Sequence, residues 1–271
     1  MKENVNGYLM RLSRQAFIRS HEKGQIKKSI NRLRLLLKRD FRGELDDQFL
    51  FGSYARKTIL PRFMDEQSDV DYMIVFSDGS YNPQTYLDRL RRFVDANYRS
   101  DTRQSHPTIQ LELSHIRFEL VPAITGGFWS SHPYKIPAKA NDFTDWVGTD
   151  PGDFQEDLVS TNKKHNNFIK PLVRILKYWN AANGYPFDSF DLERRIVSEV
   201  SNSWHVFGKP KAIKSYFYGF IEQLPSSGLA QWKLDVIERA QSTVDTVKRV
   251  DRSDDSSEAL WHLHKMLPPP W

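Results

Sequence analysis

The stretch FGSYARKTILPRFMDEQSDVDYMIVF, Phe51 to Phe76, begins with a Gly-Ser pair and ends in an apolar run. Two aspartates, Asp69 and Asp71, stand at the entrance to that run on either side of a valine. Neighbouring carboxylates repel each other, and placing them beside apolar residues costs desolvation free energy. The pattern therefore calls for a compensating positive charge.

A bound divalent cation would supply this charge. In a β-strand, residues two apart project from the same face, so a strand that starts at Asp69 places both carboxylates together. Carboxylate oxygens bind Mg²⁺, and catalytic phosphoryl-transfer sites often hold a pair of metal ions. A third acid usually completes such a site. The candidate is Glu119 in RFELVPA, and its competitor is Glu112 in LEL.

Gly52 and Ser53 suggest a phosphate contact near these acids. They follow the apolar run FLF and precede YARKTI, a segment that is able to open a helix. Glycine permits close backbone approach, amides at a helix start favour phosphate oxygens, and the Ser53 hydroxyl adds a donor. A plain turn with a helix N-cap would use the same dipeptide. The prediction therefore rests on the combination with the aspartates and the later acid.

Composition narrows the class of protein. The chain has 271 residues, of which 39% are hydrophobic, enough for one large domain or two lobes. It has no cysteine, which excludes disulfides and thiolate metal sites. No stretch approaches the roughly 20 apolar residues of a membrane span, and the N-terminus has no signal-peptide core, so we expect a cytoplasmic protein. The net charge of +5 favours polyanionic partners only weakly.

Hydrophobic periodicity predicts an α+β lobe to about residue 150 and an α-helical lobe after it. Asp69 begins a predicted strand, two more strands fall within 106–124, and 125–142 is expected to be a loop rich in Gly, Pro and Ser. Residues 154–184 form one long helix or two helices broken near Pro171. The other predicted helices cover 25–41, 83–98, 189–204, 211–224, 233–250 and 257–267.

The order of these motifs resembles the nucleotidyltransferase superfamily of the polymerase-beta type, in which Gly-Ser, a short helix and an Asp-x-Asp strand follow one another. Within it, FELVPAI is similar to the third-acid strand of cGAS/DncV-like nucleotidyltransferases and oligoadenylate synthases. LVRILKYWN (Leu172–Asn180), FDSFDLE (Phe187–Glu193) and the closing ALWHLHKMLPPPW resemble further segments of that branch. The likeness spans roughly residues 25 to 271. Glu119 departs from it, because the family more often has Asp there.

The resemblance implies a bilobal fold with a mixed sheet and a long helix in a catalytic lobe, residues 1–150. A helical lobe, residues 151–271, would complete the nucleotide-binding cleft. It also implies two Mg²⁺ ions, replaceable by Mn²⁺, with Asp69, Asp71 and Glu119 as catalytic residues and metal ligands. The implied nucleotide contacts are Gly52, Ser53, Lys177 and Ser189.

The implied activity is nucleotidyl transfer that joins nucleoside triphosphates (ATP, GTP or pyrimidine triphosphates) into a cyclic or short linear oligonucleotide with release of pyrophosphate. In the family such a product is a second messenger that switches on a separate effector in anti-phage defence. Two alternatives stay open: transfer onto RNA or protein, and a degenerate relative that binds nucleotide or RNA without turnover. No membrane partner is expected, and direct nucleic-acid binding is not favoured.

Three side chains of the predicted helical lobe carry separate expectations. Lys177 is expected to contact phosphate, with a solvated lysine on an amphipathic helix as the alternative. Trp179 and Trp261 have apolar neighbours at helical spacing, so both are expected in the core.

Overall fold

The structure is a computed structural model that describes residues 3–99, 102–105, 107–127, 130–138, 145–203, 210–252 and 255–270. Its internal contacts divide the chain into two units. The sheet unit comprises 19–59 and 67–155, and the helical unit comprises 1–18, 60–66 and 156–271. The helical unit therefore includes the N-terminal helix and a short segment after residue 59, which the sequence did not indicate.

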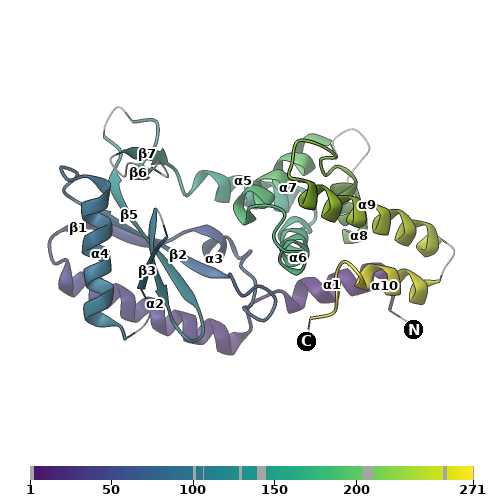
Figure 1. Ribbon diagram of the computed structural model, residues 1–271, viewed down its shortest axis with the longest axis horizontal. Coiled ribbons are helices and arrows are strands. Elements are labelled where there is room, and N and C mark those ends of the chain that lie inside the picture. Colours follow the sequence, from purple (N-terminus) through teal and green to yellow (C-terminus); the bar gives the residue numbers. More distant parts are fainter. Residues whose placement is uncertain are drawn as a thin grey trace. The chain divides into compact units, whose positions relative to one another are not determined.

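A mixed sheet forms the centre of the sheet unit (Figure 1). Its main path runs β1-β2-β5-β4-β3, with β6 paired to β5 and β7 paired to β6. The β2–β5 pair is parallel, and the other pairs are antiparallel. The strands are β1 (Leu45–Leu50), β2 (Asp69–Phe76), β3 (Thr102–Ser105), β4 (Thr108–Glu112), β5 (Arg117–Thr125), β6 (Tyr134–Pro137) and β7 (Trp146–Thr149).

Helices α2 (Ser20–Asp40) and α4 (Pro83–Asn97) border one face of this sheet. On that face, the Phe76 ring contacts Tyr86 of α4 and Phe41, which follows α2. The alternate residues of β2 face the other way, where Met73 and Val75 form a small buried cluster. Asp69 and Asp71 belong to this second set, so the carboxylates lie on the face opposite α2 and α4.

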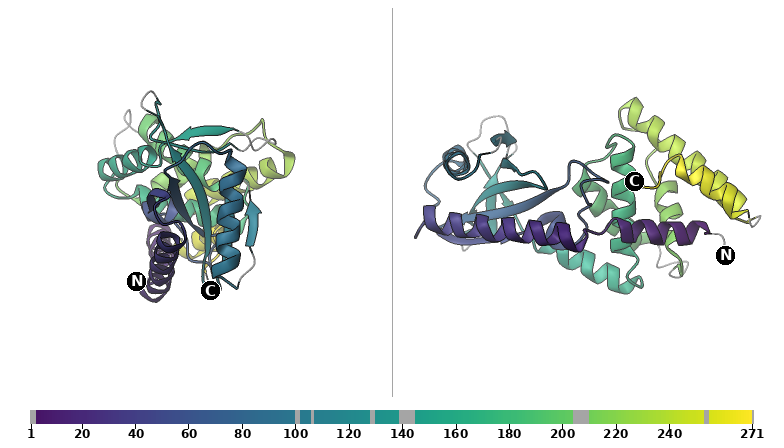
Figure 2. Two further views of the ribbon diagram at one scale, coloured as in Figure 1. Left: turned by 90° about the vertical axis from the view of Figure 1, so that its left-hand side faces the viewer. Right: turned by 90° about the horizontal axis from the view of Figure 1, so that it is seen from below.

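The helical unit is built from seven of the described helices. In it, α1 contacts α6, α8 and α10, while α9 and α10 lie side by side (Figure 2). The helices are α1 (Val5–Gln15), α5 (Asp153–Lys164, whose first residues belong to the sheet unit), α6 (Ile169–Ala182), α7 (Ser189–Ser203), α8 (Ile213–Glu222), α9 (Gln231–Arg252) and α10 (Ser256–His264).

Most of the predicted elements are confirmed. Strands β2, β4 and β5 and helices α4 and α7 to α10 occur where periodicity placed them. Helix α2 begins five residues earlier than the predicted start at Gln25. The predicted loop 125–142 is wrong in part, because it contains β6; residues 128–129 and 139–142 of that loop lie outside the described part.

Two helices rather than one long helix occupy the segment 154–184, but the break lies just before Pro171 and not at it. The chain leaves α5 after Lys164 and re-enters a helix at Ile169, with Asn166 and Asn167 at φ of 54° and 61°. Asparagine tolerates this left-handed region better than most residues. Pro171 lies in the first turn of α6, where its missing N–H costs little.

The two tryptophans differ in environment. Trp179 is fully buried, as predicted, but Trp261 is 59% exposed, so its prediction as a core residue is wrong. The ammonium of Lys265 lies 3.5 Å from the centre of the Trp261 indole ring. This cation–π contact gives the exposed ring a partner that a hydrophobic pattern does not reveal.

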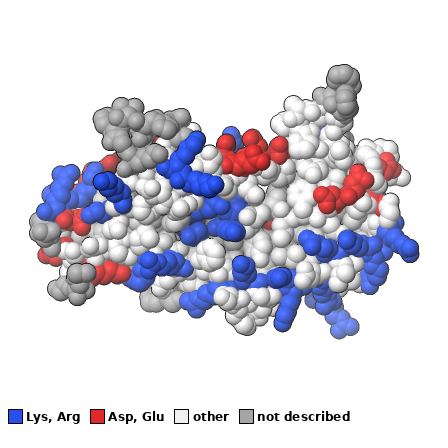
Figure 3. All heavy atoms as spheres, turned by 180° about the vertical axis from the view of Figure 1, so that it is seen from behind, with Lys and Arg blue, Asp and Glu red and all other residues white. Residues whose placement is uncertain are grey.

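Helix α2 has a buried apolar face and a basic outer face. Ile26, Ile30, Leu33 and Leu37 are buried, and Lys and Arg occupy much of the remaining surface of the helix. Lys and Arg side chains gather along the lower edge of the view in Figure 3, which includes α2. Within the described residues, no helix combines the length and apolar character that crossing a membrane requires.

Candidate active site

Asp69 and Asp71 are the first and third residues of β2, and both are half-buried. Between them Val70 is fully buried on the helix-covered face, and so is Tyr72. Burial raises the pKa of Tyr72, whose hydroxyl donates to Gln48 Oε1 at 2.9 Å and stays neutral. The strand thus separates an uncharged face from a face that presents two carboxylates, as its alternation predicts.

Strand register places Glu119 directly beside Asp71. The two are partners in the parallel β2–β5 pair, and Gln110 of β4 is the antiparallel partner of Glu119 on its other side. The row across the three strands therefore reads Asp71, Glu119, Gln110. Gln110 Nε2 donates a hydrogen bond to Glu119 Oε1 at 2.9 Å.

A second row runs parallel to the first and contains the competing acid. In it Arg117 is the register partner of both Asp69 and Glu112. Glu112 is two strands away from Asp69 and forms an ion pair with Arg117, with 3.5 Å between Oε2 and Nε. Its position and this ion pair make Glu112 a weaker candidate than Glu119 for the third acid.

The donor set of Asp69, Asp71 and Glu119 suits a hard cation such as Mg²⁺, because all its ligand atoms are carboxylate oxygens. The three residues also occupy adjacent positions on one face of the sheet. Within the described residues, however, no group of three or more His, Asp or Glu side chains is gathered closely enough to hold a metal ion. The backbone arrangement therefore fits the metal, whereas binding would require the side chains to converge.

Gly52 brings the Gly-Ser turn into contact with Asp71. It has a φ of 65°, and a Cβ built on it would lie 1.8 Å from Asp71 Oδ2. Next to it, the Phe51 amide donates to the Asp71 carbonyl at 3.2 Å. Ser53 is buried, and its carbonyl accepts from the amides of Thr58 and Ile59, which closes the loop after α3 (Gly52–Arg56). Only glycine fits where the carboxylate meets the backbone.

Gly52→Ala should therefore displace Asp71 as well as strain the backbone. The left-handed conformation alone costs a residue with a Cβ roughly 1–2 kcal/mol. The clash should also lower turnover on the order of 100-fold, as a misplacement of about 1 Å does in a catalytic site. Pyrophosphate release and thermal unfolding would be measured side by side.

Gly43→Ala is the matched control. Gly43 also has a left-handed φ, of 78°, but a Cβ there would meet nothing within 4 Å. It should show the backbone cost without the loss of turnover. Equal turnover in the two variants would contradict a role for the Gly52–Asp71 contact.

Lys177 and Ser189 lie in the helical unit, on α6 and at the start of α7. Lys177 is 6% exposed, so the alternative of a solvated lysine is wrong. Its ammonium lies 3.3 Å from Oε1 of Glu193, which is 1% exposed. Ser189 is half-buried, and the adjacent Asp188 carboxylate accepts from the amides of Phe190 and Asp191 at the start of α7.

The structure adds three neighbours of the expected site residues that the sequence did not predict: Gln110, Arg117 and Glu193. Gln110 and Glu112 are two residues apart on one strand and therefore share a face, but the spacing does not show that this is the face of Asp69 and Asp71. Glu193 ends the quoted FDSFDLE segment, but its pairing with Lys177 depends on how α6 and α7 pack.

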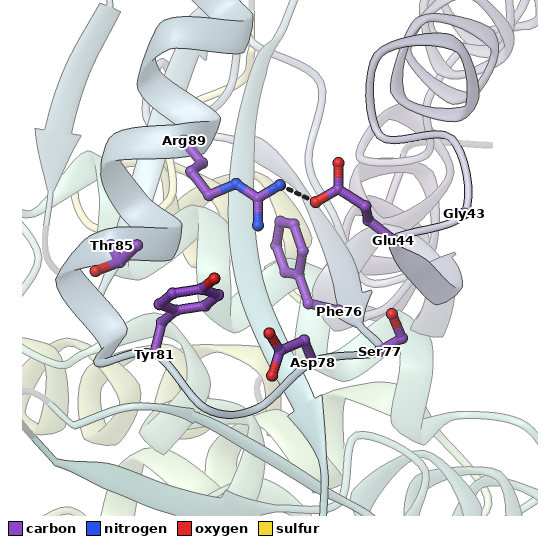
Figure 4. Close-up of a pocket in the computed structure, with 8 residues that line it drawn as sticks. All are labelled: Gly43, Glu44, Phe76, Ser77, Asp78, Tyr81, Thr85 and Arg89. Atoms are coloured by element: carbon purple, nitrogen blue, oxygen red, sulfur yellow. Dashed lines mark hydrogen bonds and ion pairs between the residues drawn. The ribbon is translucent and has the colours of Figure 1, made fainter.

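A cavity of about 420 Å³ lies at the opposite end of β2 from the aspartates (Figure 4). Arg89 of α4 reaches across it to Glu44, and the Arg89 guanidinium also lies over the rings of Phe41 and Phe76. The cavity is lined by Gly43, Glu44, Phe76, Ser77, Asp78, Tyr81, Thr85 and Arg89. It lies roughly 23 Å along the strand from Asp69, and none of the predicted site residues lines it.

Comparison with known protein families identifies the family of the chain. Residues 4–162 match the model of the Second Messenger Oligonucleotide or Dinucleotide Synthetase domain, SMODS, which covers the Gly-Ser turn and all three acids. The chain belongs to the SMODS family. The match confirms the relationship to cGAS/DncV-like nucleotidyltransferases that the motifs indicated.

Two curated relatives and one solved structure agree with this assignment. A probable cyclic nucleotide synthase of Bacillus cereus is 23% identical over 176 residues, 62% of this chain and 51% of the relative. A cyclic AMP-AMP-AMP synthase of Acinetobacter is 30% identical over 142 residues, 50% of this chain and 39% of the relative. The matches thus span about half the length of these relatives, or less.

The solved structure of the Bradyrhizobium diazoefficiens CD-NTase CdnG in complex with GTP superposes with a TM-score of 0.73 at 9% identity. The superposition covers 98% of this chain and 95% of that one. It confirms the predicted fold class, the α+β fold of the polymerase-beta-like nucleotidyltransferases.

Proposed function

We propose that this SMODS-family protein is a Mg²⁺-dependent nucleotidyltransferase that joins nucleoside triphosphates into a cyclic or short linear oligonucleotide. The observation that carries the proposal is the placement of Asp69, Asp71 and Glu119 on one sheet face, with Gly52 against Asp71. The names of the relatives support it, since one is a cyclic AMP-AMP-AMP synthase and the other a probable cyclic nucleotide synthase.

Each group of site residues has a different role in the proposed reaction. Asp69, Asp71 and Glu119 would hold Mg²⁺, which supplies the charge that neutralises the triphosphate and activates the attacking hydroxyl. The Gly52 backbone and the Ser53 hydroxyl bind phosphate oxygens, which orients the leaving pyrophosphate. Lys177 would contribute a positive charge to nucleotide binding. Ser189 would contribute a further contact to the donor nucleotide.

In this proposal the product acts as a second messenger on a separate effector in anti-phage defence. The names of one relative and one similar structure favour ATP or GTP among the substrates. A cyclic AMP-AMP-AMP synthase is among the relatives, and the CdnG structure holds GTP.

The test is to incubate the purified protein with the four nucleoside triphosphates and Mg²⁺, without any nucleic-acid or protein acceptor. We expect pyrophosphate release and a phosphatase-resistant oligonucleotide, whose bases, ring size and linkage mass spectrometry and nuclease digestion would establish. Incorporation that occurs only after RNA or a protein is added would favour transfer onto that acceptor. Nucleotide binding without pyrophosphate release would favour a degenerate relative.

A further inference from the structure

Glu119 lies between two polar neighbours on the open face of the sheet. Asp71 is its register partner on β2, and Gln110 is its register partner on β4. The Gln110 amide donates to one Glu119 oxygen, Oε1, at 2.9 Å, and the pair is partly buried. A hydrogen bond to a carboxylate is stronger than one between neutral groups.

This bond matters because the side chain of Glu119 is one methylene longer than those of Asp69 and Asp71. Its extra methylene adds a rotatable bond, so an unrestrained Glu119 carboxylate would sample more positions than an aspartate does. The hydrogen bond to Oε1 restricts that freedom. It also leaves the second oxygen, Oε2, for another ligand on the face shared with Asp71.

A purely structural role explains the Gln110–Glu119 pair less well than a role in orienting the Glu119 carboxylate does. A cross-strand polar pair on an open sheet face contributes little to stability. The neighbouring row, Asp69, Arg117, Glu112, has a cation in its central position, whereas Gln110 offers Glu119 a neutral donor. A neutral donor orients a carboxylate without cancelling the charge that would attract a metal ion.

We propose that Gln110 is a positioning residue, which restrains the Glu119 carboxylate through Oε1 so that Oε2 is available for metal binding and turnover when the three acidic side chains converge. The inference rests on the proposed function, in which Glu119 is a metal ligand. It assigns no contact between Gln110 and substrate; Gln110 acts through Glu119.

The variant that tests this is Gln110→Met, which keeps the length of the side chain and removes the donor. Turnover should fall about 10- to 100-fold, the range found for residues that orient metal ligands. The KM for the triphosphate should change little, because the nucleotide contacts remain. Stabilisation by a non-hydrolysable triphosphate should need more Mg²⁺, by about tenfold over the wild type.

Gln104→Met on β3 is the matched control. Gln104 is also half-buried on this sheet, and its amide donates to Gln84 Oε1 at 3.1 Å, away from the acids. It should leave turnover and Mg²⁺ dependence unchanged. Equal behaviour of the two methionine variants would overturn the inference.

A double-variant cycle with Glu119→Gln separates positioning from a structural contribution. If Gln110 acts through Glu119, adding Gln110→Met to Glu119→Gln should cause no further loss. Additive losses would overturn the inference. A wild-type protein that binds triphosphate without releasing pyrophosphate would instead refute the proposed function. The Mg²⁺ dependence of triphosphate-induced stabilisation would still test Gln110 in that case.

Discussion

Asp69→Asn combined with Asp71→Asn should reduce pyrophosphate release to background. The two carboxylates are the metal ligands that the proposed function requires most, and asparagine keeps their size while removing their charge. Adding Mg²⁺ with a triphosphate should raise the melting temperature of the wild type but hardly that of the double variant, because a ligand stabilises only the state that binds it.

The stability of the metal-free protein gives the second half of this test. Removing two like charges from one strand face relieves repulsion. Arg117, however, is the register partner of Asp69 and loses a neighbouring carboxylate in the variant. We expect these effects to oppose each other and to change the free energy of unfolding by about 1 kcal/mol or less.

Asp46→Asn with Asp47→Asn is a suitable control, since these exposed acids lie on the neighbouring strand β1. It should leave turnover intact. The double variant at Asp69 and Asp71 could instead melt at a clearly lower temperature without metal and yet retain turnover. That result would show that the pair is structural and would contradict its role as a metal ligand.

The sequence predicted those helices and strands whose hydrophobic pattern is set by neighbouring residues. The alternation in β2 and the 3.6-residue period of α4 come from neighbouring residues, so both could be read directly. Strand β6 could not be predicted in this way, because its four residues, Tyr134–Pro137, lie in a segment rich in proline and glycine and are held by pairing with β5 and β7. Asn166 and Asn167 likewise end a helical pattern through their backbone conformation rather than their hydrophobicity.

The same division applies to the site. The shared face of Asp69 and Asp71 follows from their spacing alone. The contact between Gly52 and Asp71 depends on the pairing of β1 with β2, and Gln110 becomes a neighbour of Glu119 only through the β4–β5 register. Strand register between distant segments is set by the whole sheet, which is why these partners were not visible in the sequence.

Lys177→Ala should lower stability as well as triphosphate binding. A lysine with no buried partner would leave the melting curve unchanged when it is replaced by alanine. In the structure the substitution removes the cation beside the Glu193 carboxylate, which is almost fully buried. Breaking a buried ion pair from one side costs about 3–5 kcal/mol, because the remaining charge stays desolvated.

A second variant separates the two roles of Lys177. Lys177→Met combined with Glu193→Gln removes both charges while keeping similar volumes, and such replacements of buried ion pairs are often neutral for stability. The melting temperature should therefore return towards that of the wild type. The stabilisation produced by a triphosphate should remain weak, because the positive charge that contacts it is still missing. If the double variant regained both stability and triphosphate affinity, Lys177 would be a structural partner of Glu193 and not a phosphate contact.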